Sequence, residues 1–251
     1  MDWQDGPSVQ LDPISARASA LIRYTSGTTG RPKGAVLSHG NLLSSVRALE
    51  IAWRWQTEDT LILALPLFHM HGLGVGLHGS LAVGARAVLL PEFEVNEVLD
   101  SIQKYEATMF FGVPTMYNRL VQSPRAPEIS QLRLCVSGSA PLAAELHQRI
   151  QAVSGQRVLE RYGMTETAML VSNPYEGERR PGSVGFPLPG VEVLLKGEPP
   201  EILVKGPNVF EGHWERPEAN SQAFDDGWFR TGDLGALDAD GYLSIVGRAK
   251  E

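Results

Sequence analysis

The amino-acid sequence predicts an α/β protein, in which a mostly parallel sheet with helices on both faces is followed by a small antiparallel β-rich unit. From about residue 20 to residue 163, short apolar stretches alternate with longer stretches of helical character, which is typical of a parallel sheet covered on both faces. After about Gly185, short strand-like stretches are separated by Gly, Pro and Asp, which favours an antiparallel unit. A chain of 251 residues that is 43% hydrophobic can also bury a substantial core. We therefore divide it into an α/β core, residues 1–185, and a β-rich subdomain, residues 186–251.

The individual elements follow in order from the apolar runs and their boundaries. Short apolar runs that end at glycine, proline or polar positions predict buried strands over 20–25, 60–66, 85–90, 107–114, 132–138 and 157–163. The stretches between them predict helices over 38–53, 72–84, 94–106, 115–122 and 143–155. Ser38 or Asn41 can cap the first helix, and each glycine in 72–84 weakens the second. Strands of the β-rich part are expected over 191–195, 200–206, 227–235 and 241–247.

Composition and charge exclude several classes of protein. The formal net charge of −7 argues against a broad nucleic-acid surface. The only cysteine, Cys135, lies in an apolar run, so we expect it to be buried and the protein to suit a reducing, cytoplasmic compartment. The acidic, polar start of the chain is not a signal peptide. The stretch 61–85 lacks Asp, Glu, Lys and Arg, but its proline, five glycines and three histidines favour a buried strand, a turn and a helix over a membrane span.

A loop rich in hydrogen-bond donors follows the first predicted strand. The stretch "TSGTTGRPKG", Thr25 to Gly34, holds three glycines, three threonines, one serine and two cations. Glycine-rich turns expose successive backbone N–H groups that bind anionic oxygen, so phosphate is the expected ligand. An ordinary surface loop would not need so many donors. The P-loop pattern G-x-x-x-x-G-K-[ST] does not fit, because Gly27, Gly30 and Lys33 are three apart and a glycine follows the lysine.

Two later motifs add groups that suit a nucleotide. In "ERYGMTET", Tyr162 can stack on a base, Thr165 can meet a phosphate oxygen, and Glu166 can hold Mg²⁺, which prefers oxygen ligands and shares them with phosphates. In "WFRTGDLG", the carboxylate of Asp233 can accept two ribose hydroxyls. Each motif alone also fits a structural role, as a capped turn or as an aspartate in a hairpin turn.

Taken together, "YTSGTTGRPKG", "YGMTE", "TGDLG" and "GRAKE" occur in this order along nearly the whole chain, and with them the sequence resembles the adenylate-forming superfamily of acyl-CoA synthetases, adenylation domains and luciferases. The resemblance implies that a carboxylate attacks the α-phosphate of ATP, pyrophosphate leaves, and the thiol of CoA takes the acyl group, with Mg²⁺ as the metal. It implies catalysis by positioning and charge neutralisation, through Lys33, Thr165 and Glu166, with the last two at the metal. The implied nucleotide-binding residues are Thr25, Ser26, Gly27, Thr28, Thr29, Gly30, Lys33, Ser139, Ala140, Pro141, Glu160, Tyr162, Gly163, Thr165, Asp233 and Arg248.

Arg161, beside Tyr162 in "ERYGMTET", is the candidate for recognising the substrate acid. A cation facing the pocket from a strand end suits a second carboxylate held bidentately, whereas an ion pair with Glu160 or a surface acid is the alternative. The runs "VLERYGMTET", "FHMHGL" and "FGVPTMY" are similar to malonyl-CoA synthetases within the superfamily. The resemblance therefore implies malonate or methylmalonate, bound by Arg161, Ser139, His69 and Met70.

Two further groups of residues are expected to have no site role. His69, His71 and His78 lie among no Cys or carboxylate, so a zinc site is disfavoured. Arg179 and Arg180 in "EGERRPG" are expected in a solvated loop.

Members of the superfamily carry a long segment before "YTSGTTG" and a mobile small domain after "GRAKE", so we expect this chain to represent the ATP- and acid-binding core, lacking both. Such a core is expected to bind ATP weakly and to form little acyl-CoA alone. A truncated nucleotide-binding module without turnover and an acyl-CoA synthetase for another small carboxylic acid stay open as alternatives. A luciferase-like monooxygenase is disfavoured, because a pocket for a dicarboxylate argues against a bulky luciferin. The expected partners are a small carboxylic acid, ATP and CoA, with neither nucleic acid nor a membrane.

Overall fold

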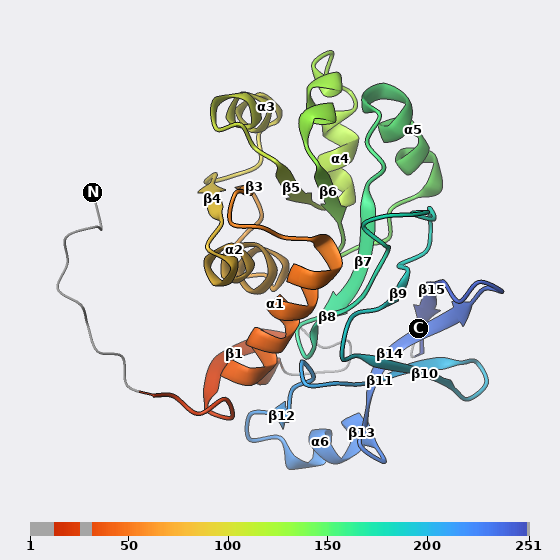
Figure 1. Ribbon diagram of the computed structural model, residues 1–251. Helices are drawn as coiled ribbons and strands as arrows, with labels where there is room; N and C mark the ends of the chain where they lie inside the picture. Colours follow the sequence, from red (N-terminus) through yellow and green to blue (C-terminus); the bar gives the residue numbers. More distant parts are fainter. Residues whose placement is uncertain (1–12, 26–31, 250–251) are drawn as a thin grey trace.

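A seven-stranded sheet forms the centre of the fold in the computed structural model, which describes residues 13–25 and 32–249 (Figure 1). Its strands lie in the order β4, β3, β5, β6, β7, β8, β9. The strands from β4 to β7 pair in parallel with one another, whereas β8 pairs antiparallel with β7 and with β9. The bounds are β3 (Thr60–Leu63), β4 (Arg86–Leu89), β5 (Met109–Gly112), β6 (Leu134–Ser137), β7 (Leu159–Met164), β8 (Ala168–Ser172) and β9 (Phe186–Pro187). The predicted mostly parallel sheet is confirmed.

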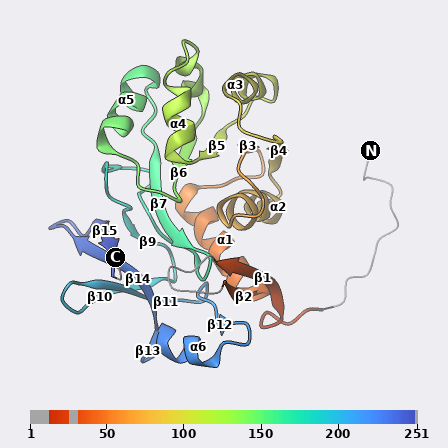
Figure 2. The same ribbon diagram turned by 180° about the vertical axis from the view of Figure 1, so that it is seen from behind.

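Helices cover both faces of this sheet, because successive strand residues point to opposite sides. Ile62, Phe110 and Cys135 pack in one buried cluster with side chains of α3, α4 and α5. The residues next to them along the strands, such as Leu63 and Phe111, pack in a second cluster with α1 and η2. In the ribbon, α3, α4 and α5 lie on one side of the parallel strands, and α1 and α2 lie on the other (Figure 2). The bounds are α1 (His39–Trp53), α2 (His78–Val83), α3 (Val95–Lys104), α4 (Pro114–Leu120) and α5 (Ala144–Ser154), with the π-helix η2 (His71–Leu77) and the 3-10 helix η3 (Ala126–Gln131).

The apolar stretch 61–85 folds as the sequence indicated. It begins in the buried strand β3, turns at 64–70, and continues through η2 into α2. The glycines permit close packing here, since a Cβ at Gly79 would lie 2.4 Å from the indole of Trp55. Across the described ranges, we find no helix with the length and apolar character needed to cross a membrane. The cytoplasmic location stays a prediction.

The first predicted strand differs from its prediction. β1 (Ser19–Thr25) pairs antiparallel with β2 (Lys33–Ser38), and β2 pairs with β12 (Gly212–His213) in a separate three-stranded sheet. Its side chains alternate, with Ile22 and Tyr24 exposed and Arg23 and Thr25 half-buried. The strand is therefore not buried on both sides, and its inward face carries polar residues toward the rest of the molecule.

The remaining strands form a five-stranded antiparallel sheet, as expected for the β-rich part. Its path is β10, β11, β14, β13, and β15 pairs with β14. The bounds are β10 (Glu192–Lys196), β11 (Glu201–Lys205), β13 (Phe224–Asp225), β14 (Trp228–Leu237) and β15 (Leu243–Arg248), with α6 (Pro217–Ala223) before β13. Because β9 still belongs to the seven-stranded sheet, the proposed domain division at residue 185 lies one strand before the change of sheet, and it stays a proposal.

Candidate active site

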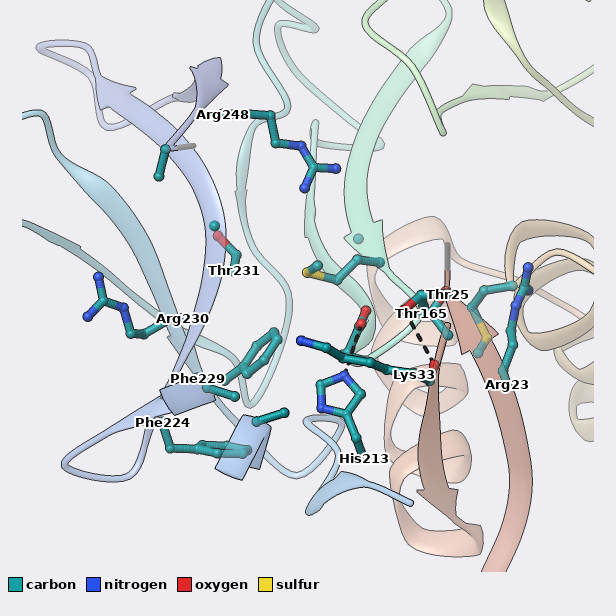
Figure 3. Close-up of a pocket in the computed structure, with 18 of the residues that line it drawn as sticks. Arg23, Thr25, Lys33, Thr165, His213, Phe224, Phe229, Arg230, Thr231 and Arg248 are labelled. Carbon is teal, nitrogen blue, oxygen red and sulfur yellow. Dashed lines mark hydrogen bonds and ion pairs between the residues drawn. The ribbon is translucent and has the colours of Figure 1, made fainter. Parts of the chain in front are cut away.

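A cavity of about 1040 Å³ lies where the three sheets meet, at the carboxyl ends of the parallel strands (Figure 3). The three-stranded sheet contributes Thr25 and Lys33, and the seven-stranded sheet contributes Arg161. Arg230 and Arg248 come from the five-stranded sheet. Ligands of open α/β sheets bind in the crevice beyond the carboxyl ends of the strands, so this cavity is the candidate binding site of the fold.

The described ends of the glycine-rich loop lie at this cavity. Thr25 ends β1 and Lys33 begins β2, and the two residues pair directly across the strands. The Thr25 hydroxyl donates to the Lys33 carbonyl at 3.4 Å, and the Lys33 side chain projects into the cavity (Figure 3). The predicted phosphate-binding residues Ser26, Gly27, Thr28, Thr29 and Gly30 lie outside the described residues.

Thr165 and Glu166 occupy the tight turn between β7 and β8 and line the same cavity. Glu166 is buried, and its Oε1 lies 3.6 Å from Nε2 of His213 on β12. No group of three His, Cys, Asp or Glu suited to a metal occurs in 13–25 or 32–249. The oxygens of Thr165 and Glu166 are hard donors that fit Mg²⁺ only if substrate oxygens or water complete its shell.

A chain of polar contacts joins the seven-stranded and five-stranded sheets beside the cavity. The Tyr162 hydroxyl on β7 donates to Asp233 Oδ2 on β14 at 2.6 Å, and Arg248 Nε on β15 lies 3.0 Å from Asp233 Oδ1. Burial raises the pKa of the Asp233 carboxyl, although Tyr162 and Arg248 oppose that rise. Arg248 lines the cavity itself, whereas Tyr162 and Asp233 stand behind its lining.

Besides Tyr162 and Asp233, three further predicted nucleotide-binding residues do not line the cavity, namely Glu160, Ala140 and Pro141. The buried Glu160 carboxylate accepts from the backbone N–H groups of Leu142 at 2.9 Å and Gly182 at 3.2 Å. Its side chain therefore holds backbone segments together. Ser139 and Gly163, from the same motifs, do line the cavity.

Arg161 projects a buried guanidinium into the cavity, as the sequence indicated. The residue is 5% exposed, and its Nε and Nη2 have no hydrogen-bond partner among the described residues. The predicted alternative, an ion pair with Glu160, does not form within that same part of the chain. Burial lowers the pKa of the guanidinium to about 9, because a charged group loses its hydration when it leaves water.

The other predicted acid-binding residues belong to the same cavity as Arg161. His69, Met70 and Ser139 all line the cavity. His71, from the same motif, lies 3.5 Å from the Ser139 hydroxyl through its Nδ1 and is buried. Burial, and then the charge of Arg161, hold the pKa of His71 well below its usual range. Both causes favour the neutral imidazole, so His71 does not compete with Arg161 as a cation.

Arg23 is a cavity residue that the sequence analysis missed. Its Nη2 lies 2.9 Å from Nδ1 of His69, while Nε and Nη1 are buried without a partner among the described residues. Burial, and then the charge of Arg23, lower the pKa of His69, so a neutral His69 accepts this bond. The sequence shows only that a cation interrupts the apolar run leading into the glycine-rich loop, and this alone does not show which way the side chain points.

A family model described as "AMP-binding enzyme" matches residues 2–214. The chain therefore belongs to the AMP-binding enzyme family. This match agrees with the lining of the cavity. Thr25 and Lys33 supply a hydroxyl and an ammonium group that can donate to phosphate, and Glu166 supplies a carboxylate in the turn that follows β7.

Among the relatives, the malonate–CoA ligase of Arabidopsis thaliana is 41% identical over 256 residues, which cover 91% of this chain and 42% of that protein. The solved structure of ATP-bound MatB from Rhodopseudomonas palustris is 48% identical with a TM-score of 0.90, covering 94% of this chain and 49% of that one. A malonyl-CoA ligase complex with methylmalonyl-CoA and AMP bound is 46% identical with a TM-score of 0.91, covering 98% and 56%. The chain spans about half the length of the curated relatives it matches.

Proposed function

We propose that this chain carries the ATP- and acid-binding part of an AMP-forming acyl-CoA synthetase that activates a small dicarboxylic acid, malonate or methylmalonate. The observation that carries the proposal is the buried guanidinium of Arg161, with two nitrogens that lack a partner among the described residues. A buried cation is costly unless an anion pairs with it. A monocarboxylic acid would leave it unpaired once its only carboxylate reacts, whereas a second carboxylate can pair with it bidentately.

The comparisons support the same class of substrate. The Arabidopsis thaliana relative acts, by its name, on malonate, and the malonyl-CoA ligase complex contains methylmalonyl-CoA and AMP. Arg119, a cation on α4, lies over the ring of Phe93, 5.0 Å from its centroid, and does not line the cavity, so it is no candidate for this role.

In the proposed reaction, a carboxylate oxygen of the acid attacks the α-phosphorus of ATP, and the bond to pyrophosphate breaks. The sulfur of CoA then attacks the acyl carbon, its thiol proton is lost, and AMP leaves. Lys33 and Thr25 would neutralise and hydrogen-bond the phosphates, while the oxygens of Thr165 and Glu166 would hold Mg²⁺ together with phosphate oxygens. Arg161 would fix the distal carboxylate, so that the reacting one is held in place.

The nucleotide would lie between the sheets. Asp233 and Arg248 would bind its ribose side, and Tyr162 with the segment 137–141 would enclose the adenine. Glu160 and Gly163 would support this wall from β7. Asp233 can still accept from ribose, because an ionised carboxylate has about four acceptor sites and Tyr162 and Arg248 use two of them.

Substitution of Arg161 tests the substrate class. ATP–pyrophosphate exchange would be measured with malonate, methylmalonate and acetate, for the unsubstituted protein and Arg161→Met. We expect Arg161→Met to reduce the preference for malonate over acetate by about 10⁴, because the second carboxylate loses its partner. ATP affinity should change little.

Arg119→Met is the matched control, since it removes an exposed arginine away from the cavity, and it should keep the preference. An unchanged preference in Arg161→Met would show that the carboxylate is read elsewhere, with Arg23 as the next candidate. ATP binding without any exchange would instead favour the alternative of a nucleotide-binding module without turnover.

A further inference from the structure

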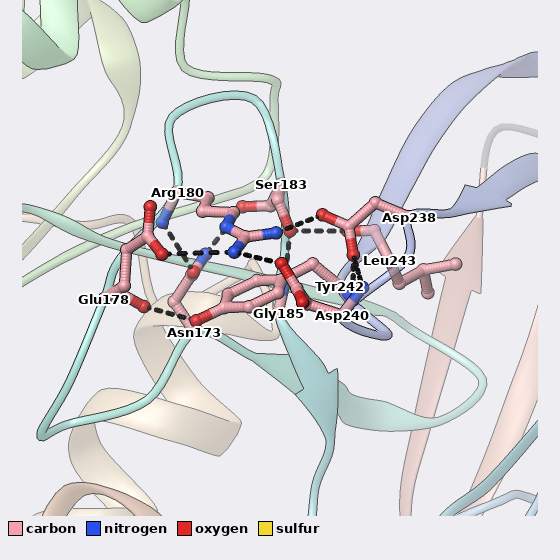
Figure 4. Close-up of polar contacts among 9 residues, drawn as sticks. All are labelled: Asn173, Glu178, Arg180, Ser183, Gly185, Asp238, Asp240, Tyr242 and Leu243. Carbon is pink, nitrogen blue, oxygen red and sulfur yellow. Dashed lines mark hydrogen bonds and ion pairs between the residues drawn. The ribbon is translucent and has the colours of Figure 1, made fainter.

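Arg180 lies in the predicted loop, and it forms the centre of an ionic cluster there, which the sequence did not indicate (Figure 4). Its Nη1 is 2.5 Å from Asp238 Oδ2, and its Nη2 is 2.6 Å from Asp240 Oδ2 and 3.2 Å from Glu178 Oε2. The guanidinium also lies over the ring of Tyr242, 4.1 Å from its centroid. One side chain thus connects the 173–185 segment to the turn between β14 and β15, 58 to 60 residues further along the chain.

Backbone bonds reinforce the same junction. The Ser183 hydroxyl and the Val184 N–H both donate to the Leu243 carbonyl, at 2.9 and 2.8 Å. The Leu243 N–H donates to the Gly185 carbonyl at 2.9 Å, and the Tyr242 hydroxyl donates to the Glu178 carbonyl at 2.9 Å. The start of β15 is therefore fixed to a segment that continues directly from the seven-stranded sheet.

The other end of the same hairpin reaches the cavity. β14 and β15 pair antiparallel, with Leu237 opposite Leu243 beside the turn and Asp233 opposite Arg248 at the far end. Asp233 and Arg248 are the residues to which we assign the ribose side of the nucleotide. A paired hairpin moves largely as one unit, so the position of its turn affects where these two side chains lie.

Charge makes Arg180 the critical member of the junction. Glu178, Asp238 and Asp240 are three carboxylates that converge on one guanidinium. Without that cation the carboxylates would repel one another across the junction, so its loss would do more than remove bonds. A planar guanidinium also satisfies several carboxylates and stacks on a ring, which a lysine ammonium cannot reproduce fully.

We propose that Arg180 is a positioning residue, which holds the β14–β15 hairpin against the 173–185 segment and so places Asp233 and Arg248 for the nucleotide. This inference rests on the proposed function, because it assumes that the cavity binds ATP. It assigns Arg180 no contact with substrate, since Arg180 does not line the cavity.

The test compares Arg180→Gln and Arg180→Lys with Arg54→Gln. Arg54 also forms an exposed ion pair, with Glu176 at 2.6 Å, but lies away from the hairpin. The dissociation constant for ATP would be measured by calorimetry on the full chain, and hydrogen exchange would be followed in residues 228–248. Circular dichroism would confirm that each variant is folded.

We expect Arg180→Gln to weaken ATP binding roughly three- to tenfold and to speed exchange in 228–248, with partial recovery in Arg180→Lys. Arg54→Gln should change neither quantity. Unchanged ATP affinity in a folded Arg180→Gln variant would overturn the inference, as would equal weakening in Arg54→Gln. If the unsubstituted protein binds no ATP, the proposed function fails first, and that result is distinct from the other two.

Discussion

Gly138 and Arg161 occupy neighbouring positions at the ends of two parallel strands, and the glycine leaves the space that the guanidinium fills. A Cβ at Gly138 would lie 2.4 Å from Cζ and 2.5 Å from Nε of Arg161. The backbone of Gly138 is not in the left-handed region, so an alanine there would strain no dihedral angle. The missing Cβ of this glycine therefore leaves the room that Arg161 occupies.

Gly138→Ala should consequently displace the guanidinium of Arg161 from its position. We expect malonate binding to weaken roughly ten- to hundredfold, because small misplacements of a binding group are costly, while acetate binding should hardly change. Calorimetric titration of both acids in the presence of ATP would check this. The double variant with Arg161→Met should be no worse than Arg161→Met alone. Additive losses would show that Gly138 acts through some other contact.

Two of the four arginines that line the cavity, Arg161 and Arg23, show what the sequence can predict at a single residue. Arg161 could be predicted because it lies inside a motif at a strand end, where parallel strands present side chains to a crevice. Arg23 could not, because a cation on an isolated strand reads as part of its exposed face. Its inward direction depends on pairing of β1 with β2 and on contact with His69, which is 46 residues away.

At the scale of elements, α1 is the best-predicted one, because its start is determined locally. Ser38 accepts from the Asn41 N–H at 3.1 Å, and Asn41 Oδ1 accepts from the Ser38 N–H at 2.9 Å. This reciprocal pattern depends only on residues three apart. Asn41 also donates from Nδ2 to the carbonyls of Pro207 and Val209, at 2.8 and 2.9 Å, which no local pattern could predict.

The two capping residues should therefore differ in their effect on stability. Ser38→Ala removes one cap and should reduce the free energy of unfolding by about 1 kcal/mol. Asn41→Ala also leaves two carbonyls without their donor, so its loss should be larger, about 2–4 kcal/mol. Urea denaturation of the two variants would measure both values. Equal losses would mean that the contacts with Pro207 and Val209 add no stability.

Elements that depend on distant partners were the ones missed. β8 is buried along its whole length, but it follows directly on a motif that we interpreted as a binding site, and its pairing partner β7 runs antiparallel. β12 and β13 are two-residue strands recognisable only by their partners, β2 and β14. α6 has no buried residue and hence no apolar periodicity to detect. Strand pairing between distant segments is set by the whole fold rather than by local sequence.

At the scale of the whole molecule, Glu160 joins three segments that surround the site. Its carboxylate, on β7, accepts from the backbone before α5 and from the 173–185 segment. Burial raises the pKa of this carboxyl from 4.5 to about 7, although the bonds from Leu142 and Gly182 oppose the rise. Since the folded state binds the proton more tightly than the unfolded state, this group stabilises the fold below about pH 4.5, and its contribution is lost as the pH rises through 7.

Glu160→Gln should remove this pH dependence, because an amide does not ionise and resembles the protonated carboxyl in shape. We expect the free energy of unfolding of the unsubstituted protein, relative to that of the variant, to fall by roughly 2–3 kcal/mol between pH 5 and 8. Urea denaturation across this range would measure it. Glu176→Gln, at an exposed carboxylate paired with Arg54, should keep the slope of the unsubstituted protein. Parallel pH profiles for Glu160→Gln and the unsubstituted protein would show that Glu160 stays ionised in the fold, held by its two backbone donors, and that burial does not dominate its titration.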